Sequence, residues 1–167
     1  IRMLQEHGAG LIRVAVDGAP DVEALSEIRK HTSAALVVDI QESFRLVPAV
    51  APLVQKIRYN PGHLHHHQKR ASAAEKVGFI VEQAQRYGIA LRIGINFGSI
   101  DPAKSGAGEG RLAAALQSAR EHIVLMRELA FENFVVSLKS SDPNEVIEIN
   151  SAFAAEFPEV PLHLGVT

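Results

Sequence analysis

Four cationic side chains stand inside short aliphatic runs of the sequence. Arg13 lies in LIRVAV, Arg58 in KIRYN, Arg92 in LRIGIN and Lys139 in FVVSLK. Arginine offers a planar fork that matches phosphate oxygens, and lysine adds a compact point charge. Asp39, in LVVDIQ, is the main counter-charge. Because unpaired buried cations are costly, this pattern predicts a bound anion of the phosphate type if these runs share one interior.

The runs that carry these charges have the alternation of β-strands, in which successive side chains point to opposite faces. In the run 91–97, Leu91, Ile93 and Ile95 share one face, while Arg92 and Gly94 share the other. The same division between an aliphatic and a polar face holds in every predicted strand. The six predicted strands are Leu11–Val16, Leu36–Ile40, Lys56–Asn60, Leu91–Phe97, Phe134–Lys139 and Leu162–Val166.

The segments between these strands are long enough for helices and carry helix-terminating residues such as Gly88. Helices are expected at Asp21–Lys30, Ala71–Tyr87, Arg111–Leu129 and Pro143–Glu156. Strands that alternate with helices form parallel sheets, so the helices cover the aliphatic faces and the polar faces share an interior. The sequence therefore predicts an α/β fold, a TIM (β/α)8-type barrel with about six of its eight βα units, in one domain over residues 1–167.

Further polar residues lie on the same strand faces as the four cations. They are Asn60, Asn96, Ser137, Ser141 and His163. Glycines 94, 98 and 165 are expected to leave room for a ligand beside the backbone. In a β/α barrel the site forms at the carboxyl ends of the strands, so we expect these residues to lie together.

The composition excludes several other classes of site. The formal net charge of −2 provides no basic field for nucleic acid, and no apolar run approaches the roughly 18 residues of a membrane span. The chain has no cysteine, so it can hold neither a disulfide nor a metal centre built on thiolates. We therefore expect a cytoplasmic protein whose own residues bind no metal.

Two motifs are interpreted as ordinary loops. HLHHHQ, residues 63–68, contains four histidines, but adjacent histidines seldom point at one ion and no carboxylate accompanies them. GAGEG, residues 106–110, lacks the lysine and serine of a phosphate-binding loop and does not join a strand directly to a helix. Neither motif is included in the predicted site.

Taken in order, RVAVDGAPD, VVDIQESFR, IRYNPG, LRIGINFGS, VVSLKSSD and PLHLGVT resemble the barrel domain of the hydroxymethylbutenyl diphosphate synthase family over essentially the whole chain. The resemblance implies an oxidoreductase that opens the ring of methylerythritol cyclodiphosphate in the non-mevalonate isoprenoid pathway. It implies a [4Fe-4S] cluster, with ferredoxin or flavodoxin as electron donor. Carried over by motif, Arg13, Arg58, Arg92 and Lys139 hold the diphosphate; Asn60, Asn96 and Ser141 are hydrogen-bonding neighbours; Asp39 and His163 line the pocket.

The sequence also departs from the family pattern. Gln41 and Ser43 stand where the family usually has a histidine and an aspartate, although Arg45 matches. The resemblance places two further strands before Ile1 and after Thr167, and the cluster domain with its cysteines outside these residues. The chain alone is therefore not expected to catalyse the reduction.

Two features leave alternatives open. The strands at Leu11 and Leu162 would expose unpaired edges, so a homodimer is expected. The divergence at Gln41 and Ser43 also fits a second interpretation, a non-catalytic phosphometabolite-binding or assembly module. A third interpretation, beside the family enzyme and this module, is a pteroate-synthase-like phosphate-binding barrel enzyme.

Overall fold

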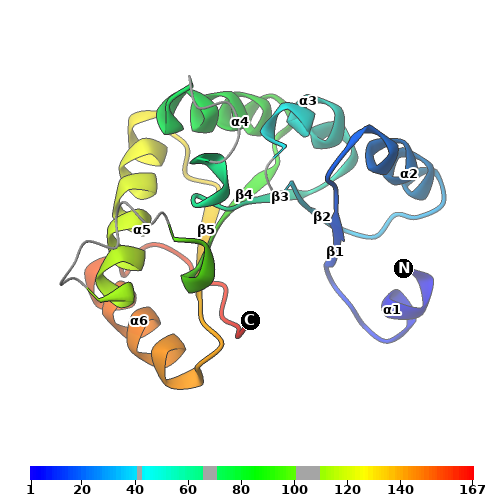
Figure 1. The fold of residues 1–167 in the computed structure, drawn as a ribbon. Helices are drawn as coiled ribbons and strands as arrows, with labels where there is room; N and C mark the ends of the chain where they lie inside the picture. Colours follow the sequence, from blue (N-terminus) through cyan, green and yellow to red (C-terminus); the bar gives the residue numbers. More distant parts are fainter. Residues whose placement is uncertain (41–42, 66–70, 101–109) are drawn as a thin grey trace.

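The computed structural model describes residues 1–40, 43–65, 71–100 and 110–167. Its centre is a curved sheet in which all neighbouring strands are parallel and follow chain order (Figure 1). The strands are β1 (Ile12–Ala15), β2 (Leu36–Asp39), β3 (Lys56–Tyr59), β4 (Ala90–Asn96) and β5 (Phe134–Lys139). This arrangement confirms the predicted α/β barrel architecture.

Apart from the short helix at the N-terminus, the helices lie along the outer, convex side of the sheet (Figure 1). The α-helices are α1 (Arg2–Glu6), α2 (Ala19–Lys30), α3 (Val47–Val50), α4 (Ala73–Tyr87), α5 (Arg111–Glu128) and α6 (Pro143–Glu156). Short 3-10 turns are η1 (Phe44–Leu46), η2 (Ala51–Leu53), η3 (His63–His65) and η4 (Phe97–Ser99). Besides the four predicted helices, the structure has α1 near the start of the chain and a short helical connection between β2 and β3. None of the described helices is both long and apolar enough to cross a membrane.

The helix ends follow local sequence chemistry. Ser72 Oγ accepts a hydrogen bond from the Glu75 amide, and the Glu75 carboxylate accepts one from the Ser72 amide, so α4 begins with a complete capping box. Gly88 ends α4 with a φ of +64°, the left-handed conformation that glycine tolerates best. Asp142 caps α6 through the Asn144 amide. These caps explain why three helix ends could be predicted to within two residues.

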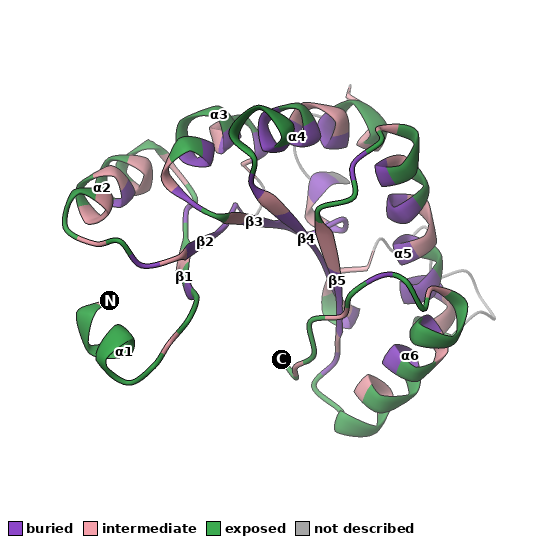
Figure 2. Ribbon diagram, turned by 180° about the vertical axis from the view of Figure 1, so that it is seen from behind, coloured by how far each residue is buried: buried purple, intermediate pink, exposed green. Residues whose placement is uncertain are grey.

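The apolar core fills the layer between the sheet and the helices, where buried residues face one another (Figure 2). Leu91 and Ile93 of β4 are fully buried there, together with Ile123 of α5 and Phe153 of α6. Burial of such side chains stabilises the fold by roughly 1.5 to 3 kcal/mol each. The aliphatic face of each strand therefore packs against the helices, and the polar face remains available to form a site.

The sixth predicted strand, Leu162–Val166, is not a regular strand in the structure. Residues 162–166 run beside β5 but form only one bridge, Leu162 to Val136, supported by the His163 amide, which donates to the Val136 carbonyl at 2.8 Å. Leu164 and Val166 are 67% and 55% exposed. The segment has β5 on one side, and no described segment pairs with its other side, so a regular ladder does not develop. The opposite edge, β1, likewise pairs only with β2 among the described strands.

Candidate functional site

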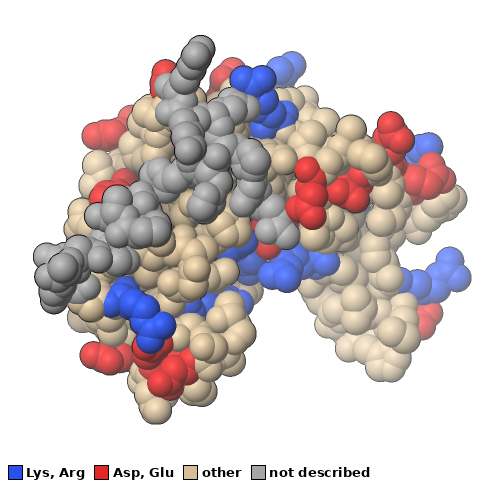
Figure 3. All heavy atoms as spheres, in the orientation of Figure 1, with Lys and Arg blue, Asp and Glu red and all other residues tan. Residues whose placement is uncertain are grey.

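The polar side chains of the inner face converge on a cavity of about 340 Å³ at the carboxyl ends of the strands. Parallel register brings them together: Asp39 lies opposite Arg58, Arg58 opposite Arg92, and Asn96 opposite Lys139. Figure 3 shows Lys and Arg side chains gathered in a hollow of the surface. The lining residues are Arg13, Asp39, Arg58, His63, Arg92, Asn96, Ser137, Lys139, Val166 and Thr167.

The innermost part of the cavity is a buried ion pair between β2 and β3. Arg58 Nη1 donates to both carboxylate oxygens of Asp39, at 3.0 and 3.2 Å, and Arg58 Nη2 donates to the Gly94 carbonyl at 2.9 Å. Both residues are 6% exposed. A hydrogen-bonded pair of this kind offsets the cost of burying each charge. The Asp39 carboxylate is therefore engaged with Arg58 and does not neutralise the other cations fully.

Gly94 makes this pairing possible, which corrects the prediction that its missing side chain leaves room for a ligand. A Cβ atom at this position would lie 2.2 Å from Arg58 Nε, so the space is filled by the guanidinium of the protein itself. Gly165 stands similarly against Lys139, whose Nζ would lie 2.9 Å from an added Cβ. Gly98 alone of the three has open space beside it.

Arg92 occupies the middle of the cavity and contacts the C-terminal segment. Its Nη1 donates to His163 Nε2 at 3.1 Å, so the imidazole is in its neutral, accepting form. Burial, and then the neighbouring Arg58, lower the pKa of Arg92 to about 10, so the guanidinium remains charged at neutral pH. Partial burial, followed by the charges of Arg92 and Lys139, lowers the pKa of His163.

Arg13 and Lys139 complete the ring of charge from the two flanks of the sheet. Arg13 Nη1 lies 3.9 Å from the Asp39 carboxylate, and its side chain is 60% exposed. Partial burial and the nearby Arg92 lower the pKa of Lys139. Among the residues that the structure describes, the lining thus carries four cations against one carboxylate that is already paired. Such an excess in a partly buried cavity favours binding of an anion with several oxygens.

Comparison with known proteins identifies the family of the chain that forms this cavity. The whole chain, residues 1–167, matches the model of the GcpE TIM-barrel domain. The chain belongs to the GcpE family. It is 52% identical over 98% of its length to the 4-hydroxy-3-methylbut-2-en-1-yl diphosphate synthase (flavodoxin) of Rhodopirellula baltica and 38% identical over 100% of its length to the protein of the same name from Nitratiruptor sp.. It spans 44% and 45% of these two relatives.

Within this GcpE barrel, the nine predicted site residues fall into three groups. Six of them line the cavity: Arg13, Asp39, Arg58, Arg92, Asn96 and Lys139. His163 touches it through Arg92. The other two stand apart. Asn60 is buried, donates to Ser99 Oγ and accepts from the Gly62 amide, and Ser141 is exposed beside the start of α6. Asn60 and Ser141 therefore do not line the cavity, because the chain has already turned away from the strand direction at both positions.

Two polar residues of the cavity were not predicted to bind the ligand. Ser137 was placed on the polar face of its strand, where the structure has it, but it was given no role because it carries no charge that would single it out. His63 was assigned to a solvated loop, yet it lines the cavity. Its place directly after Pro61-Gly62 at the end of β3 was the available signal, because barrel sites form where such loops begin.

Other sequence expectations lie outside the described residues. They concern Gln41, His66, His67 and residues 106–109. Ser43 is described, and its hydroxyl donates to the Asp17 carbonyl at 3.1 Å, away from the cavity lining. In the described ranges, no group of three or more His, Cys, Asp or Glu residues could hold a metal ion.

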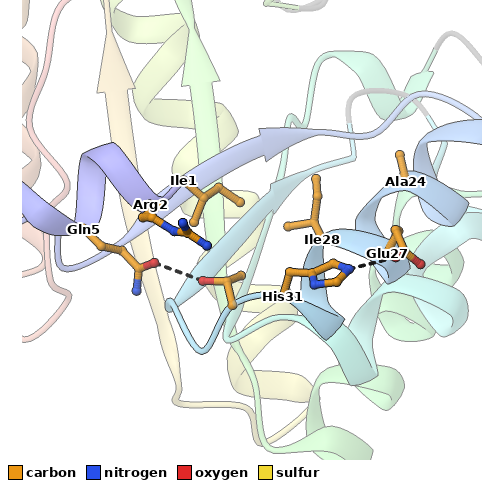
Figure 4. A pocket seen from close by; sticks show the side chains of 8 residues that line it. Ile1, Arg2, Gln5, Ala24, Glu27, Ile28 and His31 are labelled. Carbon is orange, nitrogen blue, oxygen red and sulfur yellow. Dashed lines mark hydrogen bonds and ion pairs between the residues drawn. The ribbon is translucent and has the colours of Figure 1, made fainter.

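A second cavity, of about 670 Å³, lies between α1 and α2 and has a different character (Figure 4). Its polar side chains pair with one another: Thr32 Oγ1 donates to Gln5 Oε1 at 3.0 Å, and His31 Nε2 lies 2.9 Å from Glu27 Oε1. Among the described residues of its lining, Arg2 is the single Lys or Arg. Because one cation stands beside two locally paired groups, this cavity offers no convergent set of charges for a ligand.

Proposed function

We propose that this chain is the substrate-binding barrel of a 4-hydroxy-3-methylbut-2-enyl diphosphate synthase. In this role it binds methylerythritol cyclodiphosphate for the reductive ring opening of the non-mevalonate isoprenoid pathway. One observation carries the proposal: Arg13, Arg58, Arg92 and Lys139, from four different strands, meet at one cavity whose only lining carboxylate, among the described residues, is paired. The names of the two relatives support the choice of substrate.

The four cations of the cavity contribute to diphosphate binding in two ways. Arg92 and Lys139 reach it from the middle and one flank, and Arg13 from the other flank, as charge-assisted donors. Arg58 is held by Asp39 and Gly94, so it contributes a fixed positive charge behind them. Donors that are already oriented stabilise charge as it develops on an oxygen that leaves the ring. The barrel thereby binds and orients the substrate and eases loss of that oxygen.

The reducing step does not fit the residues of this chain. The family resemblance implies a [4Fe-4S] cluster, which is held by cysteine thiolates, and the chain contains no cysteine. No step through a cluster is therefore assigned to these residues. The cluster ligands and the docking of the electron donor, flavodoxin or ferredoxin, would belong to residues other than these 167, and this chain alone would not catalyse the reduction.

The proposal also includes assembly and location. Among the described strands β1 pairs on one side only, and residues 162–166 form a single bridge, which supports a homodimer in which sheet edges are covered. The expected setting is the cytoplasm, where the resemblance places the pathway. Light scattering after size exclusion tests the dimer: a mass of one chain at micromolar concentration would contradict it.

The function is tested by isothermal titration calorimetry of the 167-residue chain with methylerythritol cyclodiphosphate, inorganic diphosphate and a pterin. We expect both diphosphates to bind with an affinity that falls as salt is added, because the cavity recognises charge, and we expect the pterin not to bind. Binding of the pterin alone would favour the pteroate-synthase-like alternative. No binding of either diphosphate would contradict the proposal.

A further inference from the structure

One wall of the cavity is formed by residues 162–167, the segment that runs beside β5 (Figure 1). Val166 and Thr167 of this segment line the cavity together with Lys139 of β5. A Cβ atom at the neighbouring Gly165 would lie 2.9 Å from Lys139 Nζ and 3.3 Å from its Cε. The end of the lysine side chain therefore occupies the space that a side chain at position 165 would need.

Backbone hydrogen bonds to β5 fix this segment on either side of Gly165. The His163 amide donates to the Val136 carbonyl at 2.8 Å, and the Thr167 amide donates to the Ser140 carbonyl at 3.0 Å. The two bonds have the same spacing along both segments, as in a parallel ladder in which alternate residues bond to the same neighbour. Gly165 thus lies midway between two anchored points, and its backbone is held close to β5.

Between these two bonds, the ladder is interrupted by Asn150 of α6. A regular parallel ladder would pair the Leu138 carbonyl with the Gly165 amide. In the described structure, that carbonyl instead accepts a hydrogen bond from Asn150 Nδ2 at 3.1 Å. The Asn150 side chain is fixed in turn, because the same nitrogen donates to the Val146 carbonyl at 2.7 Å and the residue is 6% exposed. The strand pairing is therefore open at Gly165, the position against which the lysine side chain lies.

The backbone of Gly165 does not itself require glycine. Among the described glycines, positive φ values occur at Gly8 and Gly88, so residue 165 has a conformation that alanine adopts. The constraint at this position is contact with Lys139. An added methyl group would displace the ammonium by about 0.5 Å or more, from 2.9 Å to an ordinary contact of at least 3.4 Å. Binding groups that must be held to within about 0.5 Å lose their fit after such a shift.

We infer that Gly165 is a positioning residue for diphosphate binding, because its missing side chain sets the place of the Lys139 ammonium in the cavity. This inference rests on the proposed function, in which Lys139 is one of the cations that bind the diphosphate. Gly165 acts through the lysine and needs no contact with the ligand. A lysine ammonium on its flexible stem has many positions, so a wall that restricts it reduces the entropy lost on binding.

The test is calorimetry of the 167-residue chain with inorganic diphosphate at low salt, where binding by the remaining cations is strongest. Lys139→Met removes the ammonium and is expected to weaken binding about tenfold or more, the effect of losing one hydrogen bond to a charged group. Gly165→Ala is expected to weaken binding about fivefold, because the ammonium is displaced but still present. Gly10→Ala is the matched control and is expected to bind as the parent does, because nothing lies within 4 Å of its added Cβ and it is outside the cavity lining.

A double variant separates positioning of Lys139 from a general disturbance of the segment. In the Lys139→Met background, Gly165→Ala is expected to have no further effect on diphosphate binding, since the group that it displaces is gone. A fivefold loss in both backgrounds would overturn the inference, because the effect would then not pass through the lysine. A Gly165→Ala variant that binds diphosphate as tightly as the parent, or more tightly, would also overturn it. Failure of the parent itself to bind diphosphate would instead contradict the proposed function.

Discussion

The inner face of the sheet carries one arginine at its centre and another at its flank, and the two differ in burial and in pairing. At the centre, Arg58 is 6% exposed and donates to Asp39 and to the Gly94 carbonyl. At the flank, the Arg13 side chain is 60% exposed, and its Nη1 lies 3.9 Å from the Asp39 carboxylate. A buried, bonded guanidinium belongs to the fold, whereas an exposed one is available to a ligand. Arginines that one sequence pattern places on the same sheet face can therefore differ in role: one stabilises the fold, and another is available to bind a ligand.

The largest effect is expected from removing the carboxylate at the centre. Asp39→Ala leaves Arg58 buried without its counter-charge, which we expect to lower the free energy of unfolding by about 3 kcal/mol. Urea denaturation followed by circular dichroism measures the change. Arg13→Ala is the control for the flank and is expected to change stability by no more than about 0.5 kcal/mol. Equal losses of unfolding free energy in the two variants would contradict the distinction between the buried pair at the centre and the exposed arginine at the flank.

A smaller effect is expected from Gly94→Ala, which places a Cβ atom 2.2 Å from Arg58 Nε. Overpacking of this kind costs about 1 to 3 kcal/mol, and urea denaturation measures it. Gly98→Ala is a matched control, because nothing lies within 4 Å of its added Cβ. Combining Gly94→Ala with Arg58→Ala should cost less than the sum of the two single changes, because the clash has then been removed. Full additivity would show that Gly94 does not make room for Arg58.

The smallest effect concerns pH at the C-terminal segment. Because the pKa of His163 is lowered in the folded chain, the folded state binds a proton there less readily than the unfolded state does. His163 therefore has no effect on stability well above the unfolded pKa of about 6.5, and it reduces stability as the pH falls below that value. His163→Gln, which can still accept from Arg92, is expected to flatten this part of the pH profile of the urea midpoint.

The control for the pH profile is His7→Gln, at an exposed helix end far from the cavity lining. It is expected to keep the slope of the parent between about pH 7.5 and 5.5, the range over which an ordinary histidine titrates. If the His163→Gln profile is as steep as that of the parent, the contact between Arg92 and His163 does not shift the proton equilibrium.

Much of this arrangement could be predicted because it depends on local periodicity. The alternation in LRIGIN assigned Arg92 to the polar face and Ile93 to the core, and both assignments match the structure. The capping residues Ser72 and Gly88 set the ends of α4 within two residues of the expected range. These signals operate within a few residues of one another, so the sequence displays them directly.

Other features could not be predicted because they depend on what each residue meets in space. Asn60 continues the polar alternation of its strand, but the chain turns at that point, and its amide joins two loops instead of lining the cavity. His63 stood in a histidine-rich run that resembled a solvated loop, and it was brought to the cavity by the packing of Gly62 on Ser99. Residues 162–166 have strand-like alternation but only one paired side.

The sequence by itself determined the two faces of each strand, and with them the excess of positive charge on the inner side, because side-chain direction in a strand is a property of backbone geometry. Tertiary structure alone decided which cation is paired. Parallel register set Asp39 opposite Arg58, and the missing side chain of Gly94 let that guanidinium lie against the neighbouring strand. Pairing depends on distances between strands, which no local pattern records, so the division between structural and ligand-binding cations emerges only when the sheet forms.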